Sequence, residues 1–232
     1  DATSTAVRWI ISLAPFGIMG LIFTTISEQG LGVLLSYGRL ICILVGTMLF
    51  VALVINPIIT FICTRQNPYP LVLRCLKDSG ITAFFTRSSA ANIPVNMELC
   101  KDLGLDEDTY SISIPLGATI NMDGTAAYQG VCALFIAQLY GIDLTASQYM
   151  TIIVTGTLAS IGTAGVPGAG FIMLTMILTS LGLPLEGSAL IAGIDRILDM
   201  PRTYVNITGD AAVTLLVDKS EKKHAEAEAP LY

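Results

Sequence analysis

The chain has 232 residues, of which 53% are hydrophobic and 13% are charged, and its formal net charge at pH 7 is −6. A soluble globular domain carries about 25% charged residues, so this composition, with a mean hydropathy of +0.71, argues against a soluble protein and predicts an all-α integral membrane protein. The negative charge gives no reason to expect a nucleic-acid partner. The only histidine, His224, lies in a polar tail, and no nucleophile–base pair or metal-ligand cluster is visible, so we do not expect an enzyme.

Two uncharged stretches lie near the start, at residues 9–27 and 40–63, and each is long enough for one membrane-spanning helix. Residue 1 is not Met and stands just before the first span. We therefore expect the chain to be the C-terminal part of a longer protein whose N-terminal helices are missing.

Three further apolar segments follow, and each of the first two is interrupted. Residues 66–100 are broken by Arg87-Ser88-Ser89 and Pro94, and residues 109–140 by Asn121-Met122-Asp123-Gly124. Residues 144–185 carry no charge and are about twice as long as one span. Glycines and a proline gather at their midpoint, which predicts a hairpin that enters and leaves by one face. An ordinary loop between two full crossings is the alternative.

The last helix, which we expect over residues 187–216, carries charges at membrane depth. Its polar residues are spaced by four, three, four and four, so they share one helical face: Asp195, Asp199, Arg202, Asn206 and Asp210. An isolated charge at the bilayer centre costs about 2.5–3.5 kcal/mol, so this face is expected to bind a charged substrate or ion. A salt-bridge ladder that only neutralises itself is the alternative, but three aspartates against one arginine favour a site that takes cations.

The distribution of basic residues tests this layout. If residues 66–100 and 144–185 are both re-entrant, one side of the membrane receives eight basic residues: Arg8, Arg65, Arg74, Lys77, Lys101, Lys219, Lys222 and Lys223. The other side then has Arg39 as its only nearby basic residue. This asymmetry predicts that the C-terminal tail lies in the cytoplasm. The charged composition of the tail predicts that it is disordered.

The two hairpins also suggest an internal repeat. Hairpin 66–100 with the broken helix 109–140 mirrors hairpin 144–185 with helix 187–216, in opposite orientation. An inverted repeat with broken helices is typical of secondary transporters that bind their substrate near the bilayer midplane. We expect a scaffold-type helix and connection over residues 1–39, a transport domain over 40–216, and a tail over 217–232.

The interruptions suggest the chemistry of such a site. Unwinding at Asn121-Met122-Asp123-Gly124-Thr125 would free backbone carbonyls beside a carboxylate, and hard oxygen ligands suit an alkali cation. A tolerated glycine kink with a salt-bridged Asp123 is the alternative. Half-helix N-termini at the two hairpin tips would point backbone N–H groups at an anion. Arg202 is the natural clamp for a carboxylate, because its planar fork binds both oxygens.

Four motifs resemble those of the dicarboxylate/amino acid:cation symporters, which include the glutamate transporters and the archaeal aspartate transporters. They cover nearly the whole chain in the order of that family: Arg87-Ser88-Ser89, Asn121-Met122-Asp123-Gly124-Thr125, Ser160-Ile161-Gly162-Thr163 with Val166-Pro167-Gly168-Ala169-Gly170, and Asp199-Met200-Pro201-Arg202-Thr203-Tyr204-Val205-Asn206-Ile207-Thr208-Gly209-Asp210. The resemblance implies a multi-pass, elevator-type, sodium-coupled symporter of the plasma membrane. It also implies a homotrimer in the lipid bilayer and no organic cofactor.

The resemblance further implies roles for individual residues. The amino acid would be bound by Arg87, Ser88, Ser89, Thr125, Val166, Gly170, Asp199, Arg202, Thr203 and Asn206. Asp199 would take the amino group and Arg202 the side-chain carboxylate. About two to three sodium ions are implied, the first held by Gly117, Asn121, Asn206 and Asp210. The second would be held by Thr119, Ser160, Ile161 and Thr163, and a third by Asp123 and Asn121 with ligands from a missing helix.

The substrate preference has two readings. The first tip reads Ser88-Ser89-Ala90-Ala91-Asn92, which is more like the serine/threonine branch of the family. Arg202 argues for aspartate or glutamate, because the resemblance implies that neutral-substrate members lack this arginine and because a buried guanidinium without a carboxylate partner is costly. We expect an acidic amino acid, with a serine/threonine or other neutral amino acid transporter as the alternative. A C4-dicarboxylate transporter and an uncoupled channel are further alternatives.

Overall fold

The computed structural model describes residues 32–228 together with Phe23 and Ser27, so the span expected at residues 9–27 lies almost entirely outside the described residues. The described segments are helices and turns, which confirms the all-α prediction. In chain order the helices are α2 (Gly32–Phe50), the π-helix η1 (Val51–Ile55), α3 (Asn56–Thr64), α4 (Tyr69–Cys75), the π-helix η2 (Leu76–Gly80), α5 (Ile81–Thr86), α6 (Ser89–Asp102), α7 (Glu107–Ile120), α8 (Asp123–Leu139), α9 (Ala146–Ile161), α10 (Ala169–Ser180) and α11 (Glu186–Glu228).

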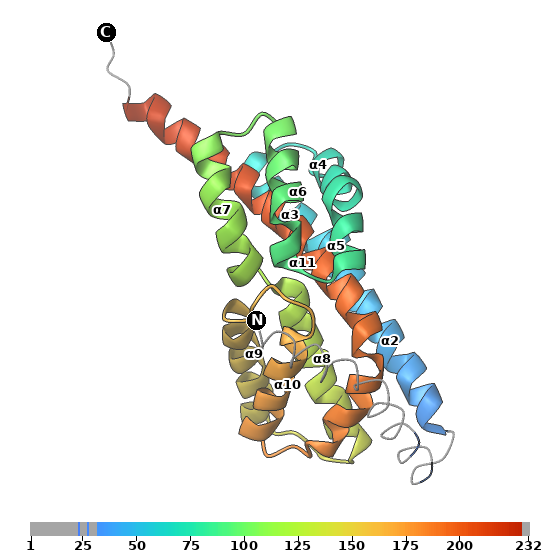
Figure 1. The fold of residues 1–232 in the computed structure, drawn as a ribbon. Helices are drawn as coiled ribbons and strands as arrows, with labels where there is room; N and C mark the ends of the chain where they lie inside the picture. Colours follow the sequence, from blue (N-terminus) through green and yellow to red (C-terminus); the bar gives the residue numbers. More distant parts are fainter. Residues whose placement is uncertain (1–22, 24–26, 28–31, 229–232) are drawn as a thin grey trace, which may run out of the picture.

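Helix α11 runs the length of the molecule, and the other helices pack around it (Figure 1). Helices α4 to α7 lie around its C-terminal half, and α8 to α10 lie beside its N-terminal half. α11 begins where we predict but continues past Leu216 to Glu228. The first part of the tail is therefore helical and not disordered, because its Ala, Glu and Lys residues are good helix formers.

The span predicted at residues 40–63 is confirmed as a helix. Residues Tyr37–Thr64 form one continuous helix with a mean hydropathy of 2.5, and only 22% of its most apolar window is buried. Among the described residues this is the helix that is long and apolar enough to cross a bilayer. The π turn η1 interrupts it just before Asn56 and Pro57, where the proline cannot donate a backbone hydrogen bond.

Two pairs of helices form the arms that we predict as hairpins. In the first, α5 ends at Arg87, which has left-handed geometry (φ 55°), and the Ser88 side chain accepts a hydrogen bond from Ala91 N–H to start α6. In the second, Gly168 (φ +81°) starts α10 after the turn that follows α9. The predicted interruption between α7 and α8 is also confirmed, because α7 ends at Ile120 and α8 begins at Asp123.

A core of fully buried side chains joins α2, α8, α10 and α11. It includes Leu44, Ile136, Leu174 and Leu198, each with no measurable exposure. This packing places the middle of α11 against the start of α8, next to both hairpin tips.

Candidate functional site

The charged face of α11 is buried, as its spacing predicts. Its five polar side chains are between 2% and 8% exposed: Asp195, Asp199, Arg202, Asn206 and Asp210. A buried ionic group is costly unless it is paired, so the partners of each side chain indicate what the site is built to do.

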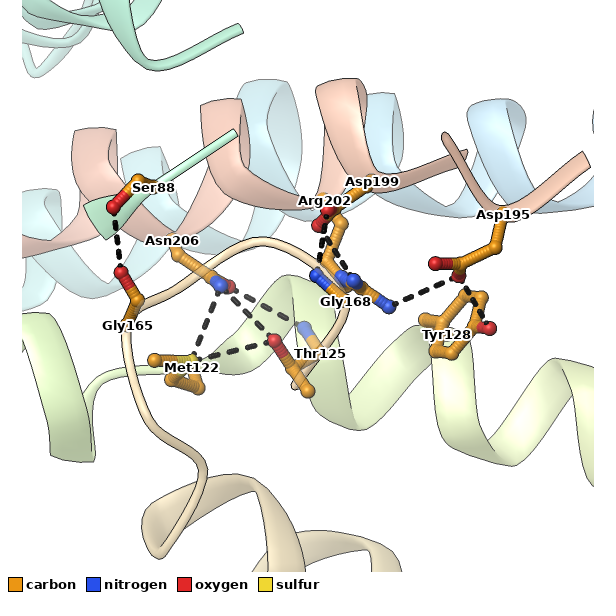
Figure 2. Close-up of polar contacts among 10 residues, drawn as sticks. All are labelled: Ser88, Met122, Thr125, Tyr128, Gly165, Gly168, Asp195, Asp199, Arg202 and Asn206. Carbon is orange, nitrogen blue, oxygen red and sulfur yellow. Dashed lines mark hydrogen bonds and ion pairs between the residues drawn. The ribbon is translucent and has the colours of Figure 1, made fainter. Parts of the chain in front are cut away.

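Arg202 is enclosed by two carboxylates and an aromatic ring (Figure 2). Its Nη2 lies 2.5 Å from Asp199 Oδ1, and its Nη1 lies 3.7 Å from Asp195 Oδ1. The guanidinium carbon stands 4.4 Å from the centre of the Tyr128 ring, and the Tyr128 hydroxyl donates a 2.7 Å hydrogen bond to Asp195. Among the described residues Nη1 has no hydrogen-bond partner. The arginine charge is therefore balanced, while one of its nitrogens keeps a free donor.

The two hairpin tips meet at Gly165. Its carbonyl accepts a 2.8 Å hydrogen bond from the Ser88 hydroxyl and a 2.9 Å hydrogen bond from the Ala90 N–H (Figure 2 shows the first). A Cβ on Gly165 would lie 2.8 Å from the Ala118 carbonyl oxygen. The second tip also reaches α11, because Gly168 N–H donates to Asp199 Oδ2 at 3.1 Å. Both tips are thus pinned over the charged face.

Asn206 joins α11 to the first turn of α8. The N-cap residue of α8, Met122, supplies no side-chain cap. Asn206 Oδ1 instead accepts hydrogen bonds from Gly124 N–H at 2.8 Å and Thr125 N–H at 3.3 Å, and its Nδ2 donates to Thr125 Oγ1 at 3.0 Å. This contact satisfies backbone N–H groups that the break in the helix leaves without partners.

Nine of the ten predicted substrate-binding residues line one pocket: Arg87, Ser89, Thr125, Val166, Gly170, Asp199, Arg202, Thr203 and Asn206. The tenth, Ser88, lies behind the pocket and holds the tip through Gly165. The free volume is about 10 Å³, which is room for roughly one water molecule. The described arrangement therefore leaves no room for an amino acid.

Three of the four residues predicted for the first sodium site lie together, namely Gly117, Asn121 and Asp210, whereas the carboxamide of Asn206 bonds the first turn of α8 instead. Asn121 Nδ2 donates to Asp210 Oδ1 at 2.9 Å, and Gly117 packs so closely that a Cβ there would be 2.7 Å from the same oxygen. Asp210 Oδ2 is buried and has no hydrogen-bond partner among the described residues. An orphaned carboxylate oxygen beside a carboxamide is a donor set that fits a hard cation.

The residues predicted for the second sodium site are less well connected. Ser160 and Thr163 are buried, but their hydroxyls donate to Thr157 and Ala159 of their own helix. Thr119 and Ile161 are exposed. Thr119 donates to Leu116, and within the described part of the chain no hydrogen bond joins it to the other three. Asp123, predicted for the third site, accepts the Gly124 N–H at 3.1 Å.

Several residues of the site were not predicted. Tyr128 stacks under Arg202, and Met122 and Gly165 line the pocket. Tyr128 stands three residues after Thr125 on α8, so helical spacing offered a signal for it. For Gly165 the sequence offers no signal beyond its place in a glycine-rich tip, because its role depends on the contact with the other hairpin.

Known proteins match this chain along nearly its whole length. Residues 1–220 match the model of the sodium:dicarboxylate symporter family. A serine/threonine transporter SstT of Streptococcus agalactiae serotype Ia is 52% identical over 224 residues, which cover 95% of this chain and 56% of that protein. An SstT of Streptococcus thermophilus (strain ATCC BAA-250 / LMG 18311) is 49% identical over 227 residues, which cover 96% of this chain and 56% of that protein.

The chain thus spans little more than half the length of these curated relatives. Both relatives are named serine/threonine transporters, and the first tip of this chain carries the features that resemble the serine/threonine branch. The match over residues 1–220 and the four motifs lead to one conclusion: the chain belongs to the sodium:dicarboxylate symporter family.

Proposed function

We propose that the whole protein is a sodium-coupled symporter that carries serine or threonine across the plasma membrane. Family membership and the two SstT relatives support this proposal. Buried charges that converge on one small pocket support binding and transport. We propose no catalytic step for this protein.

The observation that carries the substrate assignment is the double pairing of Arg202. Our expectation of an acidic substrate rested in part on a guanidinium without a carboxylate partner, and Arg202 has two such partners, Asp195 and Asp199. Asp195 and Asp199 already balance the guanidinium charge of Arg202, so the site does not need a substrate side-chain carboxylate as its partner. The free Nη1 of Arg202 can donate to a neutral oxygen, and a substrate hydroxyl supplies one.

We assign the remaining roles from the same contacts. The ammonium group of the amino acid binds Asp199 and replaces the Gly168 N–H on Oδ2. The second tip therefore moves away from Asp199 to admit the amino acid, because the described pocket is too small for one, and it closes again over the bound substrate. Ser89 lies at the start of α6, where the positive end of the helix dipole favours the substrate carboxylate.

Sodium is the coupled cargo in this proposal. Asp210 and Asn121 bind one ion with Gly117 and Asn206 beside them, and binding there stabilises the contact between α7 and α11. The group Thr119, Ser160, Ile161 and Thr163 takes a second ion only after α7 and α9 move closer. About two to three ions per cycle are proposed.

We also propose the membrane architecture predicted from the sequence. The two arms are re-entrant hairpins within an inverted repeat, and residues 40–216 form a transport domain that moves in an elevator-type cycle. Residues 1–39 belong to the scaffold, residues 217–232 face the cytoplasm, and the whole protein is a homotrimer. The excess of basic residues on one expected side of the membrane supports this orientation.

Uptake of radiolabelled L-serine into proteoliposomes containing the full-length protein tests the proposal. We expect serine uptake with an inward sodium gradient and no uptake when choline replaces sodium. L-threonine should compete with the labelled serine, and the same concentration of L-aspartate should not. Stronger competition by L-aspartate than by L-threonine would reverse the substrate assignment. Ion flux without any substrate would instead indicate an uncoupled channel.

A further inference from the structure

A second pocket lies on the other side of the break between α7 and α8. Its volume is about 270 Å³, and it is formed by η1, α3 and α11 together with the break. Met122 lines the substrate pocket, whereas its neighbours Asn121 and Asp123 line this second pocket. The unwound segment therefore lies between two pockets, and the amino acid accounts only for the first.

The α3 wall of this pocket contributes polar groups from an otherwise apolar span. Asn56 and Thr60 line it together with Asn121 and Asp123, and the other lining residues are mainly aliphatic. A polar residue in the middle of a spanning helix is expected to face protein or a site. Asn56 is also the first residue after the π turn η1 and precedes Pro57. Irregular turns of this kind frequently lie at functional sites.

Asn56 lies beside Asp123 in this pocket, and its carboxamide interacts with the Asp123 carboxylate. Oδ1 of that carboxylate also accepts the Gly124 N–H at 3.1 Å. When the Asn56 amide donates to Asp123, its Oδ1 is left as an acceptor beside the carboxylate. Asn121 similarly uses its Nδ2 on Asp210 and keeps its own Oδ1. Three hard oxygen donors thus surround one wall of the pocket, and no basic side chain is among the pocket's lining residues.

We infer that Asn56 is a further cation ligand, and that with Asp123 and Asn121 it forms a sodium site on the α3 side of the break. Hard oxygen donors and one net negative charge in an apolar surrounding suit a monovalent alkali cation. This inference rests on the proposed sodium coupling. It replaces the expectation that the other ligands around Asp123 all come from a helix outside this chain.

The test is the sodium dependence of stability and of transport in the full-length protein. The Asn56→Leu variant keeps the side-chain volume, removes the oxygen and suits an apolar span. Thermal unfolding in detergent is followed while NaCl replaces choline chloride at constant ionic strength, because an ion that binds the folded state raises the unfolding temperature. Thr47→Ala is the matched control: Thr47 lies on the same spanning helix, and its hydroxyl bonds only the Ile43 carbonyl of its own turn.

We expect Asn56→Leu to need about tenfold more sodium for the half-maximal shift, and to lower the sodium Hill coefficient of serine uptake. Asn56→Ala, as a second variant, should behave alike, and Thr47→Ala should match the wild type. Unchanged sodium dependence of both readouts in a folded Asn56 variant would overturn the inference while leaving sodium coupling intact. A wild-type protein that responds equally to sodium and choline would overturn the proposed function itself.

Discussion

Arg202 and Asp199 stand one turn apart on α11 and form a 2.5 Å ion pair in which both side chains are almost completely buried. Asp199 uses its other oxygen to hold Gly168 of the second tip. The same carboxylate therefore neutralises the arginine and fastens the tip (Figure 2). A substrate that competes for Asp199 acts on both contacts at once, which links binding to movement of the tip.

The charge balance around Arg202 predicts the effect of Asp195→Asn. This change removes one of the two carboxylates that balance the guanidinium of Arg202 and keeps the side-chain shape, so Asp199 is left as its carboxylate partner among the described residues. We expect L-aspartate to compete with labelled L-serine about tenfold better than in the wild type, which corresponds to about 1.4 kcal/mol. Tyr128→Phe removes the hydroxyl on Asp195 without changing charge and serves as the control. An unchanged ratio of aspartate to serine affinity in Asp195→Asn would contradict the role of charge balance.

The contact between the two tips predicts the effect of Gly165→Ala. The new methyl group would lie 2.8 Å from the Ala118 carbonyl oxygen and 3.0 Å from the Ala90 nitrogen, and backbone atoms cannot move aside. We expect serine affinity to fall at least about tenfold, because the added methyl group keeps the two tips from closing over the substrate. Gly130→Ala is the matched control, since nothing lies within 4 Å of the added methyl on α8. Equal serine affinity of the two variants in equilibrium binding would count against tip closure.

The capping role of Asn206 predicts a loss of stability in Asn206→Ala. The Gly124 N–H would lose the 2.8 Å hydrogen bond to Asn206, and the Thr125 N–H would lose a weaker one, in a buried place. The expected cost is about 2 kcal/mol, measured as a lower free energy of unfolding in detergent without substrate. Thr157→Ala, which removes an exposed hydroxyl bonded within α9, should change stability by no more than about 0.5 kcal/mol. Comparable values for the two variants would show that the cap is dispensable.

Asp218, in the segment we assign to the cytoplasm, predicts a pH dependence. Its burial opposes ionisation, but hydrogen bonds from Lys222 Nζ at 2.7 Å and Asp106 N–H at 2.9 Å outweigh burial and hold the pKa of Asp218 below its ordinary value of 3.8. Because the folded-state pKa is the lower one, the stabilisation is complete above the unfolded value and disappears as the pH falls through the folded value.

We therefore expect Asp218→Asn to be less stable than the wild type at pH 7, with the difference vanishing below the folded-state pKa. Unfolding followed by circular dichroism from pH 7 downwards measures this. Glu221→Gln, an exposed neighbour on α11, should track the wild type at every pH. If the stability difference between Asp218→Asn and the wild type stayed the same at the lowest pH measured, it would not come from ionisation of Asp218.

The sequence predicts those parts of the site that depend on one helix. The face from Asp195 to Asp210 follows from helical spacing in an apolar context, and the break before Asp123 follows from Asn and Gly inside a span. Contacts between helices are different, because they depend on distances that no local pattern sets. The stacking of Tyr128 under Arg202 and the two hydrogen bonds to Gly165 are of this kind.

The difference between features of one helix and contacts between helices also explains which predictions were wrong. A buried Arg202 indicates a carboxylate partner, but spacing alone cannot tell a substrate carboxylate from Asp195 and Asp199. The helical extension of α11 beyond Leu216 reflects strong helix propensity, which outweighed the high charge that suggested disorder. Thr119 is exposed in the described arrangement. Its expected sodium site with residues of the second hairpin therefore requires a movement of helices, which no local sequence pattern predicts.

Equilibrium binding of L-serine to the full-length protein at two sodium concentrations tests the central claim most directly. If the α11 site binds a hydroxyl amino acid together with sodium, the serine Kd falls as sodium replaces choline, and by linkage serine tightens sodium binding by the same factor. L-aspartate should bind more weakly than L-serine at both concentrations. A serine Kd that is equal in sodium and in choline, or tighter binding of aspartate than of serine, would contradict the account.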